Sequence, residues 1–269
     1  MNTIWDTVRQ GRILEGETII DLHAHLGPWY NFRIPGDPGP EGMMAAMDTC
    51  GIDKVVCAPH LALANDVVGG NNLIADVVRR YPERFLGYCT LNPHYPEEVV
   101  AELEKHILQG NLVAIKIHPS FHHYPAEGSN YRPVWEFAQE HGLLVLTHTW
   151  DGDENCAPGR FVKIAQEFPR VNILLGHSGG KGKGMEEALE AAEQADNLYL
   201  DLTGSQLPRG VLEAAVKRIG AERICFGTDL PFVDCRPQIG YVAYARISDE
   251  DKRKIFGQNA LRLLHLNKP

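Results

Sequence analysis

The chain has 269 residues and an ordinary globular composition, with 44% hydrophobic and 23% charged residues. Its formal net charge of −9 argues against nucleic acid as the main partner, and no apolar run is long enough to span a bilayer. The N-terminus lacks the layout of a signal peptide, and the six cysteines include no C-x-x-C motif. We therefore expect a cytoplasmic protein with reduced cysteines, no membrane or nucleic-acid partner, and a small-molecule substrate.

Strand-like and helix-like patterns alternate along the whole chain. Most of the strand candidates are continuous apolar runs, which suits parallel strands covered on both faces. Pro96 should open one helix, and Gly51, Gly110 and Gly142 should close others. The strands are expected at residues 17–23, 53–59, 85–91, 112–118, 143–148, 171–177, 197–202 and 223–228. The helices are expected at residues 41–50, 71–81, 96–109, 131–141, 159–168, 184–195, 208–219 and 249–264.

Eight consecutive β-then-α units without a long linker predict an α/β fold, a (β/α)8 TIM barrel. We expect one domain over residues 1–269, with an extra C-terminal helix that contains residues 255–264. A doubly wound sheet is the alternative fold, but the chain lacks a G-x-G-x-x-G motif after its first strand.

The first strand carries a short polar run, D-L-H-A-H. Asp21, His23 and His25 occupy alternate positions, so they should share one face of the strand, with apolar residues on the other. Two imidazoles two residues apart at a strand end can chelate one cation. Taken alone, the pair could still arise by chance.

Chemistry-bearing residues also end four later strands of the expected barrel. Lys116 and His118 end the fourth strand, His148 the fifth, His177 the sixth and Asp229 the eighth. The carboxyl ends of barrel strands meet at one mouth, so these side chains should converge. Histidine nitrogens and a carboxylate oxygen suit Zn²⁺ or a similar ion, which would hold a water at an open position.

Other histidines and three loops carry weaker signals. Structural roles are expected for His60, His94, His106, His141 and His265. The aromatic loop 27–33, which contains Trp29, is either a substrate lid or packing at the rim. The Gly/Lys loop 179–184 is an anion-binding candidate, although a solvated loop is the expected case. Loop 151–155 has the composition of a calcium loop but not its spacing.

These motifs, in this order, resemble the amidohydrolase superfamily of metal-dependent TIM barrels. The matching segments read DLHAH, AIKIHP, VLTHTW, PRVNILLGHSGG, RICFGTDLPF and IFGQNALRLL, and they cover nearly the whole chain. More narrowly, the chain looks like the amidohydrolase-related group that includes aminocarboxymuconate-semialdehyde and γ-resorcylate decarboxylases. The resemblance implies a divalent metal, with one Zn²⁺ as the first expectation and two ions as the alternative. It is compatible with a homodimer.

The resemblance also implies roles for single residues. His23, His25 and His148 would be metal ligands. Asp229 would reach the metal and accept a proton from its water. His177 would lie beyond the metal's ligands and polarise the bond under attack. Apart from the resemblance, Trp29 is a candidate substrate contact because its aromatic loop borders the same mouth.

The fourth strand leaves two arrangements open. In binuclear members a carboxylated lysine bridges two metals, and Lys116 resembles that lysine, with His177 then also a ligand. We favour a mononuclear site in which His118 lies close to the substrate. Otherwise Lys116 is a buried amine paired with a carboxylate such as Asp21.

Three functions are open at this point. The first expectation is a metal-dependent hydrolase that uses activated water on a lactone, an amide or a related C–O or C–N bond. The alternative is a non-oxidative decarboxylase of a small aromatic or unsaturated carboxylic acid on the same scaffold. A metal-binding protein without turnover is a third hypothesis. It is disfavoured because a structural site would not need an acid-base group such as Asp229 at an open position.

Overall fold

The computed structural model describes residues 3–31, 33–204 and 208–266. Eight parallel strands follow one another in chain order around one sheet. Backbone hydrogen bonds from Leu22 N to Phe226 O and from Asp229 N to His23 O join the last strand to the first. The predicted (β/α)8 barrel is thereby confirmed. Its strands are β1 (Ile20–Leu26), β2 (Lys54–Pro59), β3 (Phe85–Thr90), β4 (Ala114–Ile117), β5 (Leu144–His148), β6 (Asn172–Gly176), β7 (Leu198–Asp201) and β8 (Ile224–Cys225).

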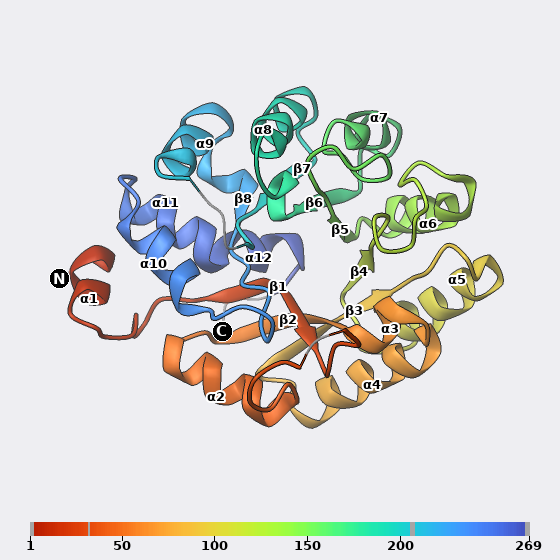
Figure 1. Cartoon of the computed structure of the whole chain (residues 1–269), viewed down its shortest axis with the longest axis horizontal. Helices are drawn as coiled ribbons and strands as arrows, with labels where there is room; N and C mark the ends of the chain where they lie inside the picture. Colours follow the sequence, from red (N-terminus) through yellow and green to blue (C-terminus); the bar gives the residue numbers. More distant parts are fainter. Residues whose placement is uncertain (1–2, 32, 205–207, 267–269) are drawn as a thin grey trace.

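Helices form an outer ring around these strands (Figure 1). Sequence patterns missed three of them, α1, α3 and α10, because each is short and two lie inside connections that looked like loops. In the described ranges, no helix is long and apolar enough to cross a membrane. The helices are α1 (Ile4–Arg9), α2 (Pro40–Cys50), α3 (His60–Ala64), α4 (Val67–Arg80), α5 (Pro96–Leu103), α6 (Arg132–His141), α7 (Arg160–Glu167), α8 (Gly184–Gln194), α9 (Val211–Ile219), α10 (Arg236–Tyr244), α11 (Asp249–Arg253) and α12 (Asn259–Leu263).

The predicted helix ends are set by backbone conformation. Gly51 and Gly142 follow α2 and α6 with φ of 72° and 64°, the left-handed region that a side chain disfavours. Gly110 acts differently, because α5 first continues into a π-helical turn over Glu104–Leu108. Pro96 opens α5 as expected, at a position where its missing N–H is not needed.

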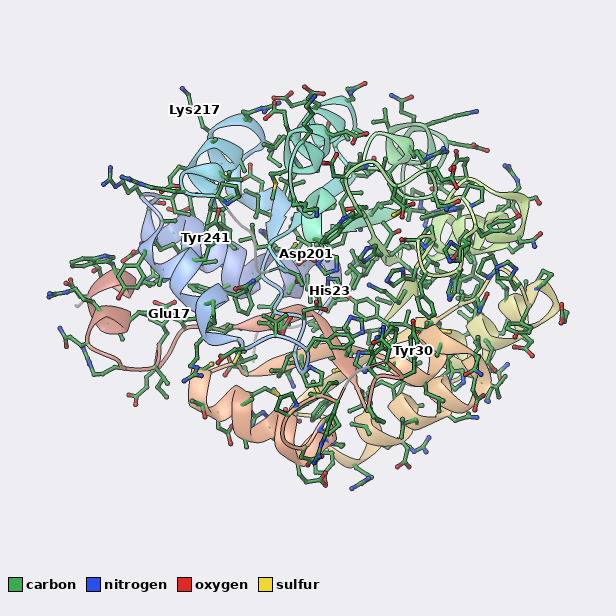
Figure 2. The ribbon with its side chains drawn as sticks, in the orientation of Figure 1. Glu17, His23, Tyr30, Asp201, Lys217 and Tyr241 are labelled. Atoms are coloured by element: carbon green, nitrogen blue, oxygen red, sulfur yellow. The ribbon has the colours of Figure 1, made fainter. Side chains whose placement is uncertain are left out.

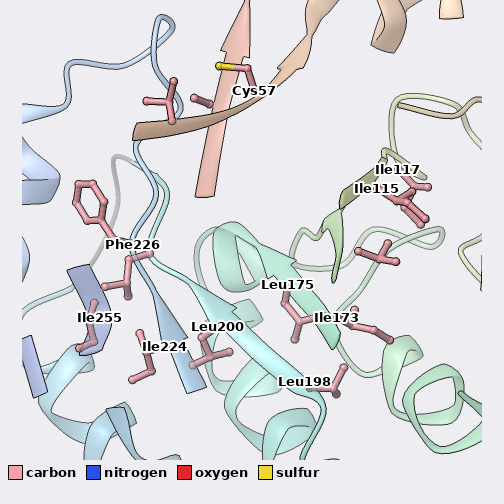
Figure 3. Packing of buried hydrophobic residues seen from close by; sticks show 14 of the residues in the cluster. Cys57, Ile115, Ile117, Ile173, Leu175, Leu198, Leu200, Ile224, Phe226 and Ile255 are labelled. Carbon is pink, nitrogen blue, oxygen red and sulfur yellow. The ribbon is translucent and has the colours of Figure 1, made fainter. Parts of the chain in front are cut away.

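The apolar residues of the strands divide into two packed layers. Residues that point outward, such as Cys57, Ile115, Leu175 and Leu200, pack against the helices (Figure 3). Alternate residues fill the inside of the barrel, among them Leu22, Val56, Tyr88, Leu146 and Leu174. Burial on both faces explains why the strands read as continuous apolar runs.

The C-terminal helical segment closes the barrel at the end opposite the strands' carboxyl termini. It runs through α11, a π-helical turn (Lys254–Gln258) and α12, which confirms the predicted extra helix. Leu261 and Leu264 join the cluster inside the barrel. Gly257 lies so close to Thr18 that an added Cβ would stand 2.3 Å from the Thr18 carbonyl oxygen. This contact accounts for the glycine within the segment IFGQN.

The first strand departs from the simple alternation expected for it. The pairing register with β2 shifts between Asp21 and Ala24, as at a β-bulge. Leu22 therefore packs inside the barrel while Ala24 packs in the outer layer. The expectation that Asp21 shares a face with His23 and His25 is wrong, because the irregularity lies between them. Asp21 instead hydrogen-bonds to the Thr228 hydroxyl and to the backbone N–H groups of His23 and Thr228.

Candidate metal centre

The carboxyl ends of the strands surround a cavity of about 270 Å³. Every residue that the sequence assigned to a site lines it, so the strand ends converge as expected. The lining residues are His23, His25, Trp29, Leu63, Lys116, His118, His148, Trp150, His177, Gly180, Thr203, Gly204, Asp229, Phe232 and Val233.

His23 and His25 turn the same ring nitrogen toward Asp229. The Nδ1–H of His25 donates to the Ala58 carbonyl oxygen at 3.1 Å, and the Nδ1–H of His23 to an Asp201 carboxylate oxygen at 2.6 Å. Their Nε2 atoms lie 3.1 Å (His25) and 3.9 Å (His23) from Oδ1 of Asp229. In neutral imidazoles these Nε2 atoms carry lone pairs, so at His25 an acceptor faces the acceptor oxygen of Asp229, whereas the Nε2 of His23 also lies 3.2 Å from Lys116 Nζ. A cation placed between them satisfies both, and the donor set of imidazole nitrogen and carboxylate oxygen fits a divalent metal.

His177 belongs to the same tight group. One donor atom each from His23, His177 and Asp229 lies within 4.8 Å of the other two. The ring centroids of His23 and His177 are 4.7 Å apart. The resemblance had placed His177 beyond the metal's ligands, whereas this geometry leaves it within reach of the same ion.

His148, the last residue of β5, also lines the cavity. Its ring is 4.7 Å from that of His177 and stacks on His118 at 4.0 Å. The backbone N–H of Phe121 donates to Nδ1 of His118 at 3.1 Å, so a neutral His118 carries its proton on Nε2. His118 is thereby suited to donate a hydrogen bond rather than to bind a metal.

Lys116 is buried at the floor of this cavity. Its Nζ lies 3.2 Å from Nε2 of His23, and burial lowers the pKa of the amine to about 8. The pairing with Asp21 considered from the sequence is not what the structure records, since Asp21 bonds to Thr228. Within the described ranges, no other lysine and no arginine lines the cavity.

Asp201, at the end of β7, is the residue that sequence reasoning missed. Its fully buried carboxylate bonds to His23 Nδ1 and also accepts from the backbone N–H of His177 at 2.9 Å. The Thr203 hydroxyl and N–H donate to its other oxygen. Figure 2 shows His23 and Asp201 together near the centre of the barrel. The available signal was an acidic residue inside the apolar run LYLDL, which burial would require to be paired.

The backbone around two of these side chains is unusual. His177 and Ser178 have φ of 63° and 46°, and Asp229 has φ of 69°, all in the left-handed region that side chains disfavour. The Ser178 hydroxyl donates to the Asp201 carbonyl at 2.8 Å, and the Thr228 hydroxyl accepts from Leu230 N at 3.0 Å. Such strained residues concentrate at functional sites, where surrounding contacts hold them.

Burial and mutual charge set the protonation states at the site. Burial lowers the pKa of His23, His148 and His177 below the ordinary range of histidine. Burial alone would raise the pKa of Asp229, but the nearby imidazoles of His25, His177 and His23 outweigh it, and the pKa falls. Neutral imidazoles beside an ionised carboxylate are the forms that bind metals.

The aromatic loop 27–33 and the Gly/Lys loop 179–184 carried weaker expectations from the sequence. Trp29 lines the cavity and contacts Phe121 and Phe232, with ring centroids 5.4 and 5.5 Å away; Phe32 of the same loop lies outside the described residues. In the Gly/Lys loop, the Asp151 carboxylate accepts from the Lys183 N–H and would meet a Cβ at Gly182 at 2.5 Å. This carboxylate lies where an anion would have to bind.

Comparison with known proteins establishes the class. The amidohydrolase family model matches residues 20–266, and the chain belongs to that family. γ-Resorcylate decarboxylase of Polaromonas sp. is 22% identical, with 88% of this chain and 86% of that protein covered. 2-Amino-3-carboxymuconate-6-semialdehyde decarboxylase of Dictyostelium discoideum is 23% identical, with 73% and 66% covered. A 2-keto-4-carboxy-3-hexenedioate hydratase of Sphingobium sp. is 24% identical, with 72% and 69% covered.

Solved structures show the same fold. 2,6-Dihydroxybenzoate decarboxylase from Rhizobium superposes with a TM-score of 0.75 at 19% identity, covering 93% of this chain and 99% of that one. A dihydroxybenzoic acid decarboxylase from Polaromonas sp., with bound manganese and 2-nitroresorcinol, gives a TM-score of 0.72 at 18% identity, covering 94% and 98%.

The chain is an enzyme of the amidohydrolase superfamily, but the expectation of a hydrolase is wrong. The relatives named above are decarboxylases and a hydratase, which favours the decarboxylase alternative. The strand-end motifs could not separate the reactions, because a metal held by histidines and a carboxylate serves hydrolysis and decarboxylation alike.

Proposed function

We propose that this protein is a metal-dependent, non-oxidative decarboxylase of a small aromatic or unsaturated carboxylic acid. The observation that carries the proposal is the convergence of His23 Nε2, His25 Nε2 and the Asp229 carboxylate, with the acceptors of His25 and Asp229 3.1 Å apart, in a protein whose relatives are named as decarboxylases. A cavity of about 270 Å³ with Trp29 and Phe232 in its wall suits a flat molecule of about one ring.

We propose that His23, His25 and Asp229 hold one divalent ion and that His148 completes the set. Zn²⁺ is our first expectation from the imidazole-rich donor set, and Mn²⁺, present in a structural neighbour, is the ion to compare with it. When bound, the ion would polarise a substrate oxygen and orient the carboxylate. His177 competes with His148 for the role of the fourth ligand, since its donor atom reaches the same group.

The remaining residues would act on the substrate directly. Loss of CO₂ breaks a C–C bond and leaves an electron pair on carbon, which must take up a proton. We assign delivery of that proton to His177, whose imidazole lines the cavity and, because burial holds it neutral, must first take up a proton from solvent. Lys116 places a positive charge at the cavity floor for an anionic substrate. His118 would donate a hydrogen bond from Nε2.

A screen of carboxylic acids tests the proposal. The protein, loaded in turn with Zn²⁺ and Mn²⁺, is incubated with dihydroxybenzoates, carboxyvanillate-like acids and unsaturated diacids while CO₂ and product are followed. Release of one CO₂ per acid consumed, abolished by chelation, supports a decarboxylase. Addition of water across a double bond without CO₂ would instead identify a hydratase and refute the proposal.

We also propose that residues 1–269 form one domain and that the enzyme works in the cytoplasm, where its thiols stay reduced. A homodimer is our expectation for its assembly. Light scattering on the purified protein measures the assembly state, and a mass near twice 30.0 kDa is the expected result.

A further inference from the structure

Two cysteines from distant parts of the chain meet in the packed layer between the strands and the outer helices. Cys50 is the last residue of α2, and Cys235 immediately precedes α10 on the same side of the barrel (Figure 1). Their Sγ atoms lie 2.7 Å apart, although 185 positions separate them in the sequence. Among the described residues, the other four cysteines make no such thiol–thiol contact.

The surroundings make the two thiols unequal. Cys235 also lies 3.8 Å from the Ala46 carbonyl oxygen, and Arg236 follows it with a positive charge. The hydrogen bond between the two thiols lowers the pKa of the Cys50 thiol despite burial, and it raises that of Cys235. A thiol with more thiolate character reacts faster with oxidants, so Cys50 is the attacking partner.

The pair lies at the end of a segment that shapes the active site. The residues between β8 and α10 include Asp229, Phe232 and Val233, all of which line the cavity. Cys235 ends this segment and contacts the last turn of α2 through Cys50 and Ala46. A covalent link here would tie the segment that carries Asp229 to the outer ring of helices.

We propose that Cys50 and Cys235 form a reversible disulfide when the protein meets a hydroperoxide. The Cys50 thiolate attacks one peroxide oxygen, the O–O bond breaks, and Cys50 becomes a sulfenic acid as hydroxide leaves. The Cys235 sulfur then attacks Cys50 Sγ, the S–O bond breaks, and water leaves. Two thiols and one hydrogen peroxide thus give one disulfide and two waters, and a dithiol returns the two electrons.

Mass spectrometry and thiol counting on the folded full-length protein test this. After treatment with hydrogen peroxide and quenching, the thiols titrated in denaturant should fall from six to four. A non-reducing digest should contain one cross-linked peptide pair, joining Cys50 to Cys235, which dithiothreitol removes. A count that stays at six, or a cross-link between other cysteines, would overturn the proposal.

A thermal measurement supplies a second readout that does not depend on enzyme activity. The link closes a loop of nearly two hundred residues, so oxidised protein should melt roughly 5 °C or more above reduced protein. Cys50→Ser should show neither the cross-link nor the shift, whereas Cys156→Ser, as the matched control, should keep both. An equal shift in Cys50→Ser would show that another oxidation causes it and would refute the proposal.

Discussion

At the residue scale, the site depends on a carboxylate that never reaches the cavity. Asp201 holds the Nδ1–H of His23, which leaves the lone pair of Nε2 turned into the cavity between Lys116 and Asp229. The same oxygen of Asp201 fixes the backbone of His177. One buried side chain therefore orients two members of the candidate metal centre, as outer partners of metal-binding histidines commonly do.

Replacing Asp201 tests this role. Asp201→Asn should lower metal affinity about 10- to 100-fold while the fold persists, because an amide holds the His23 tautomer less firmly. Thr203→Val, which removes a hydroxyl bonded to the other carboxylate oxygen, is the control, and its metal affinity should fall less than that of Asp201→Asn. Competition with a chromogenic chelator gives both affinities. Equal affinity in Asp201→Asn and the native protein would contradict the assignment.

Asp229 should matter through its charge. Asp229→Asn preserves the shape of the side chain but removes the anion that balances the cation between the imidazoles. We expect an intact fold by circular dichroism, reduced metal content, and decarboxylation slowed by at least ~10²-fold. His177→Ala should also slow turnover but retain the metal if His148 is the fourth ligand. Loss of metal in His177→Ala would mean that His177, and not His148, is the fourth ligand.

The buried position of His122 leads us to expect that the protein loses stability in acid. It is buried, with Nε2 donating to the Leu63 carbonyl and Nδ1 bonded to the Tyr131 hydroxyl, and burial lowers its pKa to about 4. Only the neutral form of His122 is favoured in the folded state. Its contribution to the free energy of unfolding is therefore complete above pH 6.5 and is lost as the pH falls toward 4. Protonation would withdraw on the order of 3 kcal/mol.

The test for His122 is a difference between two proteins. His122→Gln retains an amide donor and acceptor but does not titrate. Urea unfolding at pH 7.5 and pH 4.5 should show the stability gap between native protein and variant shrinking at the lower pH. A gap that stays constant would mean that the proton affinity of His122 does not change on folding. The neighbouring His94, His118 and His123 are present in both proteins, so their titration largely cancels.

At the scale of elements, β8 and the turn after it leave no room for a side chain at Gly227. A Cβ there would meet Thr203 Oγ1 at 2.1 Å, Asp201 Oδ1 at 2.4 Å and His23 Cβ at 2.9 Å. The glycine lets the end of β8 lie against the Asp201–His23 pair. Close packing against this pair therefore accounts for the glycine in the motif FGTD.

Gly227→Ala should destabilise the protein by about 2 kcal/mol or more and weaken metal binding, because it displaces Asp201 and His23. Gly240→Ala in α10 is the matched control, since its Cβ would find only Tyr244 at 3.9 Å. That variant should be neutral or stabilised by up to about 1 kcal/mol. Denaturant unfolding of both variants checks the pair, and similar losses in the two would contradict the packing argument.

At the scale of the whole molecule, the metal should bind the folded barrel alone, because its ligands come from strands at opposite ends of the chain. A hundredfold excess over the dissociation constant should stabilise the fold by about 2.7 kcal/mol. The melting temperature should rise by roughly 5–10 °C, reversibly with chelator. Scanning calorimetry measures the shift. An unchanged melting temperature on adding or removing the ion would argue against a metal site in the folded barrel.

Metal stoichiometry distinguishes the two arrangements left open around Lys116. We expect about one ion per chain, unchanged in Lys116→Ala. Elemental analysis of native protein and variant decides the matter. Two ions per chain, with one lost in Lys116→Ala, would show a bridged binuclear site instead.

The sequence alone determined the barrel and the end of it that carries the chemistry. Its apolar runs and helical patterns are local signals, and a parallel barrel necessarily brings all strand carboxyl ends to one mouth. His23, His25, Lys116, His148 and Asp229 could therefore be assigned to one cavity before any contact was known. The reaction could not be chosen this way, because related chemistries share these motifs.

Only the tertiary structure decided the arrangement within that cavity. The irregularity in β1 turns Asp21 away from the histidines, and Asp201 meets His23 across 178 positions of sequence. Cys50 and Cys235 likewise meet only in the fold. Contacts of this kind depend on register and rotamer, which are set when distant strands and helices pack together and leave little trace in local sequence periodicity.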